Sequence, residues 1–516
     1  MIRQKSKNIN TFLIATTIIV GMCSIVYELL ISTTASYFMG NSIQQFSLII
    51  GTYMASMGIG SWISRWVDRD LLYYFVIIEI ILGIVGAFSV PMCYAYFGYT
   101  DFTGFSFFTL FIITIIGLLT GLEVPLLTRI LENTESLKNN ISNVLAFDYL
   151  GALIATLLFP FFLVPFLGLF KSSLIFGLIN VGIGLLTYVM FKPEFSTKRR
   201  NTIVILLGFS AVLLIGFMLI QAKKLVSDWN NVIYKYDVFY EKESPYQNII
   251  LTQNPNEFRL YLNGAIQFSS RDEYRYHEGL IHVPLTQLDT INNVLILGGG
   301  EGLAVREVLK YPEIKHITLV DLDPTITDIS KKIPLIKALN QDALDDPRVH
   351  VVNADAFSYL MENEGKFDAI ISDLPDPTSE SLARLYSNAF YGLIAKNLSP
   401  EGVFATQATS PELTTNAFWC IMKTMQEAGF EHTFPYHVNV PSFGNWGFVM
   451  ATPTDRLRTA FRDNIELKFL EDGIMNHLLY FPKDKRIDDI KPNNLDQPVL
   501  LEYYLDHWHS LQGKDR

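Results

Sequence analysis

The chain has 516 residues, which is more than one ordinary domain usually contains. Its formal net charge of −11 is unevenly spread, because residues 1–220 hold 12 Lys/Arg and 10 Asp/Glu whereas the remainder holds 28 and 41. An acidic second part argues against nucleic acid as a partner, since phosphates need a basic surface. The three cysteines, Cys23, Cys93 and Cys420, are widely separated and fit neither a metal site nor a disulfide framework.

Long apolar segments fill the first part of the chain and predict a polytopic membrane domain at 1–221. Each segment has close to the ~20 residues that a helix needs to cross the hydrocarbon of a bilayer. The first is too long for the core of a cleaved signal peptide, and more segments follow it, so we expect it to be retained. The predicted helices, about seven in number, lie at 11–33, 43–64, 71–97, 105–128, 144–168, 172–191 and 202–221.

Positive charge alternates along these segments and predicts their orientation. Loops with many Lys and Arg tend to remain in the cytoplasm. Such residues occur at the start of the chain and after the second, fourth and sixth segments, at Arg3, Lys5, Lys7, Arg65, Arg69, Arg129, Lys138, Lys192, Lys198, Arg199 and Arg200. This pattern places the N-terminus in the cytoplasm, and seven crossings would then place the rest of the chain outside.

Four acids lie within or at the ends of the apolar segments: Glu28, Glu79, Glu123 and Asp148. A carboxylate inside a bilayer is costly and is a functional hypothesis by default. The alternative is that these acids sit at helix ends or pair internally with Tyr or with Arg129. The sequence leaves both readings open.

The residues after 221 change character and predict first a small β-hairpin domain at 222–285. Short β-branched and aromatic runs alternate between 230 and 270. "NPNE" at 254–257 and "NG" at 263–264 are typical hairpin turns. We therefore expect a small antiparallel sheet that forms part of a substrate site.

From residue 286 to 516 apolar strands alternate with helical segments, which predicts a doubly wound, Rossmann-like parallel sheet. The strands are expected in "NVLILGGG", "HITLVDLD", "VHVVNAD", "FDAIISD", "GVFATQ" and "WGFVMAT". In such sheets ligands bind beyond the carboxyl ends of the strands. Polar residues at those ends are therefore the candidate site residues.

The first of these strands ends in a glycine-rich turn that contains Gly298, Gly300 and Glu301. Glycines allow a ligand to approach the backbone closely. Asp321 ends the second strand about 20 residues later, the offset of an acid that accepts ribose hydroxyls. Asp321 could instead cap a helix, but Asp323, which precedes a proline, suits that role better.

The third and fourth strands end in further carboxylates. Asp355 could accept a hydrogen bond from an adenine amino group or cap the following helix, and its position does not decide between them. Asp373 and Asp376 follow the fourth strand in "SDLPDP", where Pro375 and Pro377 stiffen the loop. Two carboxylates in a fixed loop favour a cation between them, although a polar loop with one capping Asp is the alternative.

Several separated motifs in residues 235–452 resemble the spermidine synthases, which are polyamine aminopropyltransferases. They are "SPYQNIIL", "LYLNGAIQFSSRDEYRYHEGLIHVPL", "VLILGGGEGLAVREVLKYP", "LVDLDP", "NADAFSYL" and "ISDLPDP". The resemblance implies a Rossmann-like, class I methyltransferase-like fold. The first part of the chain resembles the membrane region that a subset of this family carries at the N-terminus.

The resemblance also implies a reaction, in which an aminopropyl group moves from decarboxylated S-adenosylmethionine to a diamine such as putrescine. The products would be spermidine and methylthioadenosine. By position, Asp373 would be the proton acceptor and Asp376 would hold the diamine. His277 and Glu301 would contact the polyamine or aminopropyl amine. Two further residues would line the same pocket, Tyr276 and Gln267.

On the donor side the resemblance implies that Asp321 binds the ribose, that Asp355 with Ala356 binds the adenine, and that Gln247 contacts the nucleoside. The glycines that border the donor are Gly298 and Gly300. The donor would be a co-substrate, so the resemblance implies no tightly bound cofactor. The sequence suggests no metal site.

The sequence departs from the family pattern in three places. Glu301 stands in "GGGEGL" where an Asp is usual, "DPTSESLARLY" replaces a usual Gly-Pro-Ala segment, and Phe443 stands where a pocket Tyr is expected. The last two departures concern the acceptor pocket and the loop against the nucleoside. They leave the identity of the acceptor open.

Two other functions compete with aminopropyl transfer. One is methyl transfer from intact S-adenosylmethionine on the same fold, and the other is a polyamine-binding transporter or sensor. We expect a multi-pass protein of the cell membrane, embedded in the lipid bilayer, whose soluble relatives suggest a homodimer. We also expect a cytoplasmic catalytic domain, because the family's donor is made there. A broken or re-entrant helix at 144–168 would reverse the parity of the crossings, although it would leave the "KRR" loop at 198–200 on the unfavoured side.

Overall fold

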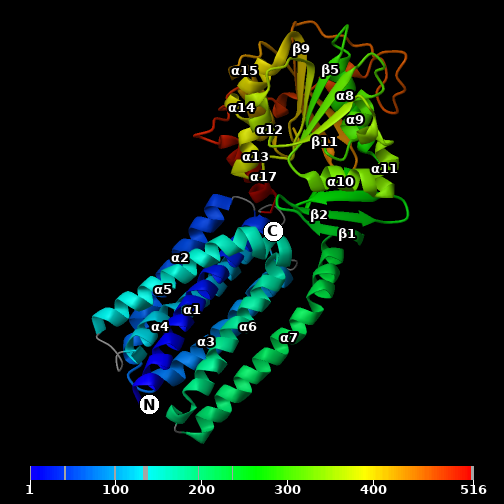
Figure 1. Ribbon diagram of the computed structural model, residues 1–516. Coiled ribbons are helices and arrows are strands. Elements are labelled where there is room, and N and C mark those ends of the chain that lie inside the picture. Colours follow the sequence, from blue (N-terminus) through cyan, green and yellow to red (C-terminus); the bar gives the residue numbers. More distant parts are fainter. Residues whose placement is uncertain are drawn as a thin grey trace. The chain divides into compact units, whose positions relative to one another are not determined.

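A computed structural model describes residues 2–39, 42–97, 100, 102–131, 137–195, 197–234 and 236–512. The chain divides into two compact units, Met1–Lys235 and Tyr236–Arg516. The first unit is helical, and the second contains two β-sheets with helices around the larger one (Figure 1).

Seven long helices lie among the described residues of the first unit. An apolar chain in lipid must satisfy its backbone hydrogen bonds internally, which a helix does completely. The helices are α1 (Ile2–Met39), α2 (Ser42–Ile63), α3 (Leu71–Phe97), α4 (Phe102–Leu131), α5 (Leu137–Leu158), α6 (Gly168–Met190) and α7 (Lys198–Tyr234), with short 3₁₀ turns η1 (Ser64–Trp66) and η3 (Lys192–Glu194).

By length and apolar composition, six continuous helical stretches among the described residues could cross a membrane. One of them, Asn140–Met190, has 51 residues and holds both α5 and α6. A π-helical segment, η2 (Phe159–Leu167), joins the two. Pro160 and Pro165 lie in this segment, and because proline cannot donate the regular helical hydrogen bond it favours such a distortion. At Gly168, with φ of +72°, the chain turns and α6 runs back along the bundle (Figure 1).

The two ends of the bundle are marked by different side chains. At the start of α7, Arg200 pairs with Asp70, which precedes α3, at 2.6 Å. At the end of α7, the Trp229 ring lies 5.5 Å from Phe38 at the end of α1 and 4.7 Å from Tyr94 near the end of α3. The start of α1 and the end of α7 therefore lie at opposite ends of the bundle (Figure 1).

This arrangement corrects two expectations. The segment 144–168 is broken at its prolines, as expected, but the end of α7 still lies at the opposite end of the bundle from the start of α1, so the break does not give the expected change of parity. The predicted end of the helical region at 221 falls inside α7, which continues to Tyr234. The boundary between the units follows Lys235.

The second unit begins with a four-stranded antiparallel sheet in the order β1-β2-β3-β4. Its strands are β1 (Asp237–Glu243), β2 (Asn248–Gln253), β3 (Phe258–Leu262) and β4 (Ala265–Ser269). Asn263 and Gly264 connect β3 to β4 and have φ of +49° and +82°, which is the type I′ hairpin turn that Asn-Gly favours. The predicted small antiparallel sheet is confirmed.

The larger sheet has seven strands in the order β10-β11-β9-β8-β5-β6-β7. The pairs among β5 to β9 are parallel, whereas β11 pairs antiparallel with β9 and β10. The strands are β5 (Asn293–Gly298), β6 (His316–Asp321), β7 (Val349–Asn353), β8 (Phe367–Asp373), β9 (Leu398–Gln407), β10 (His432–Val440) and β11 (Gly444–Thr452). This is the predicted Rossmann-like sheet of methyltransferase type, and its strand order reverses between β5 and β8, where a ligand crevice is expected.

Helices cover both faces of this sheet (Figure 1). One apolar core lies under α8 and α9, and another lies under α12, α14, α15 and α17. The helices of this unit are α8 (Glu273–Leu285), α9 (Leu303–Val308), α10 (Pro324–Lys332), α11 (Pro334–Asn340), α12 (Ala356–Glu362), α13 (Glu380–Ala383), α14 (Asn388–Asn397), α15 (Thr415–Glu427), α16 (Met475–Leu478) and α17 (Val499–Gln512), with 3₁₀ turns η4 (Ala343–Asp345), η5 (Arg384–Tyr386) and η6 (Lys483–Lys485).

Candidate active site

Asp373 lies at the carboxyl end of β8, directly beside the glycine-rich turn that follows β5. Gly298 pairs with Asp373 in the parallel ladder and has φ of +81°. A Cβ at Gly298 would lie 2.1 Å from the Asp373 carbonyl oxygen, and one at Gly299 would lie 2.9 Å from its Oδ2. A side chain at Gly298 would therefore collide with the Asp373 backbone, and one at Gly299 would displace the Asp373 carboxylate.

A tyrosine from helix α8 fixes the orientation of this carboxylate. The Tyr276 hydroxyl donates a 2.6 Å hydrogen bond to Asp373 Oδ1. Burial and the nearby Glu301 carboxylate raise the pKa of Asp373 to about 6, whereas the positive charge of His277 and the bond from Tyr276 act in the opposite direction. A carboxyl group with this pKa is mostly ionised at neutral pH yet binds a proton more readily than an ordinary aspartate.

His277, one residue further along α8, lies between two carboxylates. Its Nδ1 is 2.9 Å from Glu273 Oε2, and its Nε2 is 3.6 Å from Glu301 Oε1. Burial alone would lower the pKa of His277, but the hydrogen bonds to Glu273 and Glu301 and the charge of Asp373 raise it to about 10. The imidazole is therefore a cation at neutral pH.

Two hydrogen bonds from Arg306 hold Glu273 in place. Arg306 Nη1 and Nη2 donate to Glu273 Oε1 and Oε2, each at 2.9 Å, from a buried position on α9. Such bidentate pairs fix geometry as well as charge. Arg306 thus fixes Glu273, which in turn holds Nδ1 of His277. The Nε2 atom of the imidazole remains directed toward Glu301, beside Asp373.

Ligand atoms of His277, Glu301 and Asp373 all lie within 4.8 Å of one another. A metal ion would need a neutral imidazole, because a protonated ring nitrogen has no lone pair to offer. The raised pKa of His277 disfavours that state. The group is therefore better suited to holding a cationic amine through its two carboxylates.

Asp376 lies in the "LPDP" loop that follows β8 and is held there by two hydrogen bonds. Tyr504 of α17 donates to its Oδ2 at 2.9 Å, and Gln407 at the end of β9 donates to its Oδ1 at 3.3 Å. Tyr386 donates to the Pro375 carbonyl oxygen at 2.9 Å and so fixes the loop itself. Burial raises the pKa of Asp376 to about 6 against the effect of its two hydrogen bonds.

Asp321, at the end of β6, faces the same glycine-rich turn. Its Oδ2 accepts the Gly300 amide at 3.0 Å and its Oδ1 accepts the Asp323 amide at 2.9 Å. A Cβ at Gly300 would lie 2.6 Å from this carboxylate. Burial, and to a smaller extent the charge of Glu301, raise the pKa of Asp321 to about 7.

Asp323 caps helix α10 through the Thr325 amide, as its position before proline predicted. Its second oxygen accepts hydrogen bonds from Ser244 Oγ at 2.6 Å and from Gln247 Nε2 at 3.0 Å. Gln247 is thereby attached to the segment that follows Asp321. The turn between β1 and β2 thus joins the small sheet to the strand ends of the large one.

The remaining predicted site residues form hydrogen bonds with partners outside the group around Asp373. Asp355 caps α12 through the Ser358 amide at 3.0 Å and forms an ion pair with Arg384, and Ala356 is the first residue of that helix. Gln267 donates to the carbonyl of Ala265 in its own strand. The hydrogen bonds of these residues do not join them to the Asp373 group.

Several residues of this site were not among the predicted site residues. Gln407 ends a predicted strand and could have been found by the same strand-end argument as the acids. Glu273 and Arg306 lie inside two of the family motifs, which could have pointed to them. Tyr386 and Tyr504 reach the site from distant sequence positions.

The chain is similar to known proteins over nearly its whole length. The family described as "Spermine/spermidine synthase domain" matches residues 273–463. The polyamine aminopropyltransferase of Leptospira interrogans is 41% identical over 508 residues, covering 97% of this chain and 99% of that protein. Polyamine aminopropyltransferase 2 of Ralstonia nicotianae is 40% identical over 511 residues, covering 97% and 99%. Polyamine aminopropyltransferase 1 of Streptomyces coelicolor is 39% identical over 497 residues, covering 94% and 92%.

Solved structures resemble the second unit. A spermidine synthase in complex with the transition state analogue AdoDATO is 27% identical, with a TM-score of 0.45, and the match covers 48% of this chain and 86% of that one. The spermidine synthase of Thermotoga maritima is 28% identical, with a TM-score of 0.44, and the match covers 48% and 85%.

Proposed function

The chain belongs to the polyamine aminopropyltransferases and is an aminopropyl-transferring enzyme, and we propose that its acceptor is a diamine such as putrescine and its donor is decarboxylated S-adenosylmethionine. The products are then spermidine and methylthioadenosine. The observation that supports this assignment best is the partly buried Asp373 carboxylate at the end of β8, oriented by Tyr276 and adjacent to Glu301.

The proposed step is a displacement at carbon. One ammonium group of the diamine gives a proton to the Asp373 carboxylate, and its neutral nitrogen then forms a bond to the aminopropyl carbon that is attached to the sulfonium sulfur, while the bond from that carbon to sulfur breaks. The electron pair returns to sulfur, which leaves as the neutral thioether of methylthioadenosine. The alkylated nitrogen remains as a secondary ammonium, so charge and atoms balance.

Asp373 suits this role because of its surroundings. An alkylamine has a pKa of about 10 by analogy with Lys, so the attacking nitrogen must lose a proton before it can react. A carboxylate with a pKa of about 6 at hydrogen-bond distance can accept that proton. Since the sulfonium is already a good leaving group, the remaining contribution of the enzyme is positioning.

The acceptor needs groups that hold its charged distal amine. Asp376 is fixed by Tyr504 and Gln407 and offers a carboxylate in the same stiff loop. Glu301 and the cationic His277 border the Asp373 carboxylate on the other side. We assign Asp376 to the distal ammonium and Glu301 to the amino group of the donor, with Tyr276 and Gln267 as further lining residues.

The donor nucleoside is assigned to the glycine-rich turn. Asp321 would accept ribose hydroxyls in exchange for its present backbone partners, and Gln247 is attached to the next residues of that segment. Gly298 and Gly300 leave space at the backbone. Asp355 and Ala356 start α12, where the Asp355 carboxylate would accept the adenine amino group after leaving Arg384.

One observation also separates aminopropyl transfer from methyl transfer on the same fold. Intact S-adenosylmethionine carries an α-carboxylate, whereas the decarboxylated donor carries a lone ammonium in its place. Glu301 follows the glycine-rich turn and lies beside Asp373. Its negative charge repels a carboxylate and attracts an ammonium.

The assignment is tested by incubating the purified full-length protein with labelled decarboxylated donor and a panel of diamines and polyamines. We expect label in a longer polyamine and release of methylthioadenosine. A second incubation with methyl-labelled S-adenosylmethionine distinguishes the methyltransferase. Methyl incorporation into the amines, or amine binding without any transfer, would replace the proposed function with one of its two rivals.

We further propose that the helical unit is embedded in the cell membrane and that the catalytic unit faces the cytoplasm. The apolar helices support the first statement. The second rests on the donor, which is made in the cytoplasm and carries charges that hinder its passage across lipid. In this orientation the start of α1 faces outward, against the distribution of Lys and Arg.

A further inference from the structure

Two acidic side chains lie inside the helical unit with no exposed surface. Glu79 projects from α3 and Glu123 from α4, and both are 0% exposed. The carboxyl groups are close enough to interact electrostatically. Two ionised carboxylates cannot share such a site without a compensating cation or a shared proton.

The protein supplies little compensation to this pair. Asn180 of α6 donates one hydrogen bond to Glu79 Oε2 at 2.9 Å. Glu79 Oε1 and both oxygens of Glu123 have no hydrogen-bond partner among the described residues. The pair thus offers several buried acceptor atoms and receives a single protein donor.

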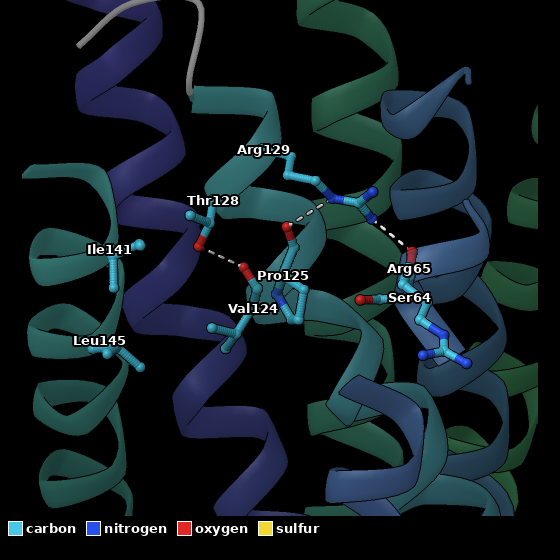
Figure 2. Close-up of a pocket in the computed structure, with 8 residues that line it drawn as sticks. All are labelled: Ser64, Arg65, Val124, Pro125, Thr128, Arg129, Ile141 and Leu145. Atoms are coloured by element: carbon cyan, nitrogen blue, oxygen red, sulfur yellow. Dashed lines mark hydrogen bonds between the residues drawn. The ribbon is translucent and has the colours of Figure 1, made fainter. Parts of the chain in front are cut away.

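The nearby arginine that could have neutralised the pair is occupied elsewhere. Arg129 lies on the same helix as Glu123 and was a candidate partner from the sequence. Its guanidinium donates instead to the carbonyl oxygen of Ser64 at 2.8 Å (Figure 2) and to that of Val67 at 2.9 Å. Within the described helical residues no Lys, Arg or His forms an ion pair with Glu79 or Glu123.

A second unpartnered polar group lies on α1. Tyr27 is fully buried, its hydroxyl has no hydrogen-bond partner in the described structure, and the charges of Glu79 and Glu123 act on it electrostatically. The ring is held against Gly86 of α3, where a Cβ would lie only 2.3 Å from it. Gly86 follows Glu79 by about two helical turns, so the Tyr27 ring packs on the same face of α3 as Glu79, and the described residues offer its hydroxyl no partner.

The unused groups define the chemistry of a ligand. Carboxylate oxygens and an amide oxygen, Asn180 Oδ1, are acceptors, and the tyrosine hydroxyl can also accept. A primary ammonium group has three N–H donors and one positive charge. It would neutralise the pair, and the electron-rich face of an aromatic ring adds a favourable contact with an alkylammonium.

We propose that Glu79, Glu123, Asn180 and Tyr27 form a second binding site, inside the helical unit, for the ammonium end of a polyamine. The choice of a polyamine rests on the proposed function, because that reaction makes alkylammonium products. The helical unit then binds the cation that the catalytic unit produces or consumes. Access requires the helices to separate locally, since the group is closed to solvent in this structure.

The test is equilibrium binding of radiolabelled spermidine to the full-length protein in lipid nanodiscs. Wild-type protein is expected to bind one spermidine in the helical unit in addition to any bound by the catalytic unit. The double variant Glu79→Gln, Glu123→Gln is expected to lose only the first of these. Asp68→Asn, a change of the same kind at an exposed acid of the helical unit, is expected to match wild type.

Two controls keep the outcomes distinct. Transferase activity is measured on the same samples, so a wild type without activity would refute the proposed function while the difference in binding would still test the helical site. Tyr27→Phe retains both acids and is expected to weaken binding at the helical site by about 2- to 10-fold, the usual effect of one lost hydrogen bond. This variant carries the test if the double variant fails to fold.

Two results would overturn the proposal. One is equal spermidine binding by wild type and a folded double variant, together with unchanged affinity in Tyr27→Phe. The other is displacement of spermidine from the helical site by sodium chloride but not by choline chloride at the same ionic strength. That result would assign the group to a metal cation instead.

Discussion

The Tyr276 hydroxyl and the Asp373 carboxylate are joined by a hydrogen bond of 2.6 Å between helix α8 and the end of strand β8. Tyr276 is itself buried, and its ring lies 5.2 Å from Phe448 and 6.0 Å from Phe443. The Tyr276 ring is fixed by apolar packing, and its hydroxyl in turn fixes the orientation of the Asp373 carboxylate, the proposed base. This arrangement gives the first prediction.

Tyr276→Phe should slow transfer by about 10- to 150-fold, because a hydrogen bond to a charged group typically contributes about 1.5–3 kcal/mol. The hydroxyl also lowers the pKa of Asp373, so its loss should move the acidic limb of the rate profile to higher pH. The measurement is kcat against pH for both proteins. Tyr274→Phe, on the same helix, is the matched control, and an unchanged profile in Tyr276→Phe would remove this tyrosine from the mechanism.

Asp373→Asn should reduce transfer by about 10²–10⁴, the usual effect of losing a general base. Binding of methylthioadenosine should stay largely intact, because the predicted donor residues lie on other strands. Both quantities can be measured on one purified sample, by turnover and by calorimetry. Asp376→Asn provides a contrast, since we expect it to raise KM for the diamine more than it lowers kcat. Near-normal turnover of Asp373→Asn would rule out the assignment.

Activity should fall as pH decreases through about 6. The pKa of Asp373 is raised to about 6, so this carboxyl group is protonated below that pH and cannot accept the amine proton. Asp376 has a pKa raised to the same value and should lose its charge in the same range, which weakens diamine binding. His277, with a pKa of about 10, should not titrate there. We expect kcat at saturating substrates to decrease about tenfold per pH unit well below 6; a rate that is constant from pH 7 to 5 would contradict this.

The acids of the site were predictable because they follow from one rule. In a parallel sheet the carboxyl ends of the strands meet at one edge, so Asp321, Asp373 and Asp376 could be grouped before their distances were known. Tyr504 could not be found in this way. It is 128 residues from Asp376 in sequence and reaches it only because α17 packs beside the sheet.

In the helical unit, too, some features could be predicted from the sequence and others could not. Apolar length identified the membrane-type segments, because lipid requires long runs without charge. It misplaced the end of α7, since Lys223 and Lys224 interrupt the apolar run while the helix continues to Tyr234. Hydropathy records where the apolar run ends, whereas the end of a helix depends on its backbone hydrogen bonds.

Phe443 should influence the choice of acceptor. Its ring lies 6.0 Å from Tyr276 and 5.2 Å from Trp446, so it borders the proposed amine site. The segment that carries it is fixed to the start of α8, because Asp272 accepts hydrogen bonds from Ser442 N and Oγ at 2.7 Å each. A phenylalanine offers the diamine no hydroxyl where the family usually has a tyrosine.

Phe443→Tyr should therefore shift the relative kcat/KM among diamines of different length, by about 0.5–1.5 kcal/mol in favour of the one whose amine reaches the new hydroxyl. The measurement is a kcat/KM profile over diamines of three to five carbons. Phe461→Tyr, at a partly buried ring that packs against the same core, is the control. Identical profiles for wild type and Phe443→Tyr would show that this position does not select the acceptor.

The last prediction concerns the side of the membrane on which the catalytic unit lies. Asp68 and the end of α7 lie at opposite ends of the helical bundle, so a site at Asp68 and a site in the catalytic unit should face opposite sides. If the catalytic unit is cytoplasmic, a membrane-impermeant thiol reagent applied to intact cells should label Asp68→Cys and spare Lys483→Cys, both of which replace exposed residues.

Background labelling should be low, because Cys23, Cys93 and Cys420 are all buried. Permeabilised cells should label both variants. The reverse pattern would agree with the distribution of Lys and Arg and would show that the donor has to reach the enzyme from outside the cytoplasm. Labelling of both sites in intact cells would contradict the arrangement of the helices itself.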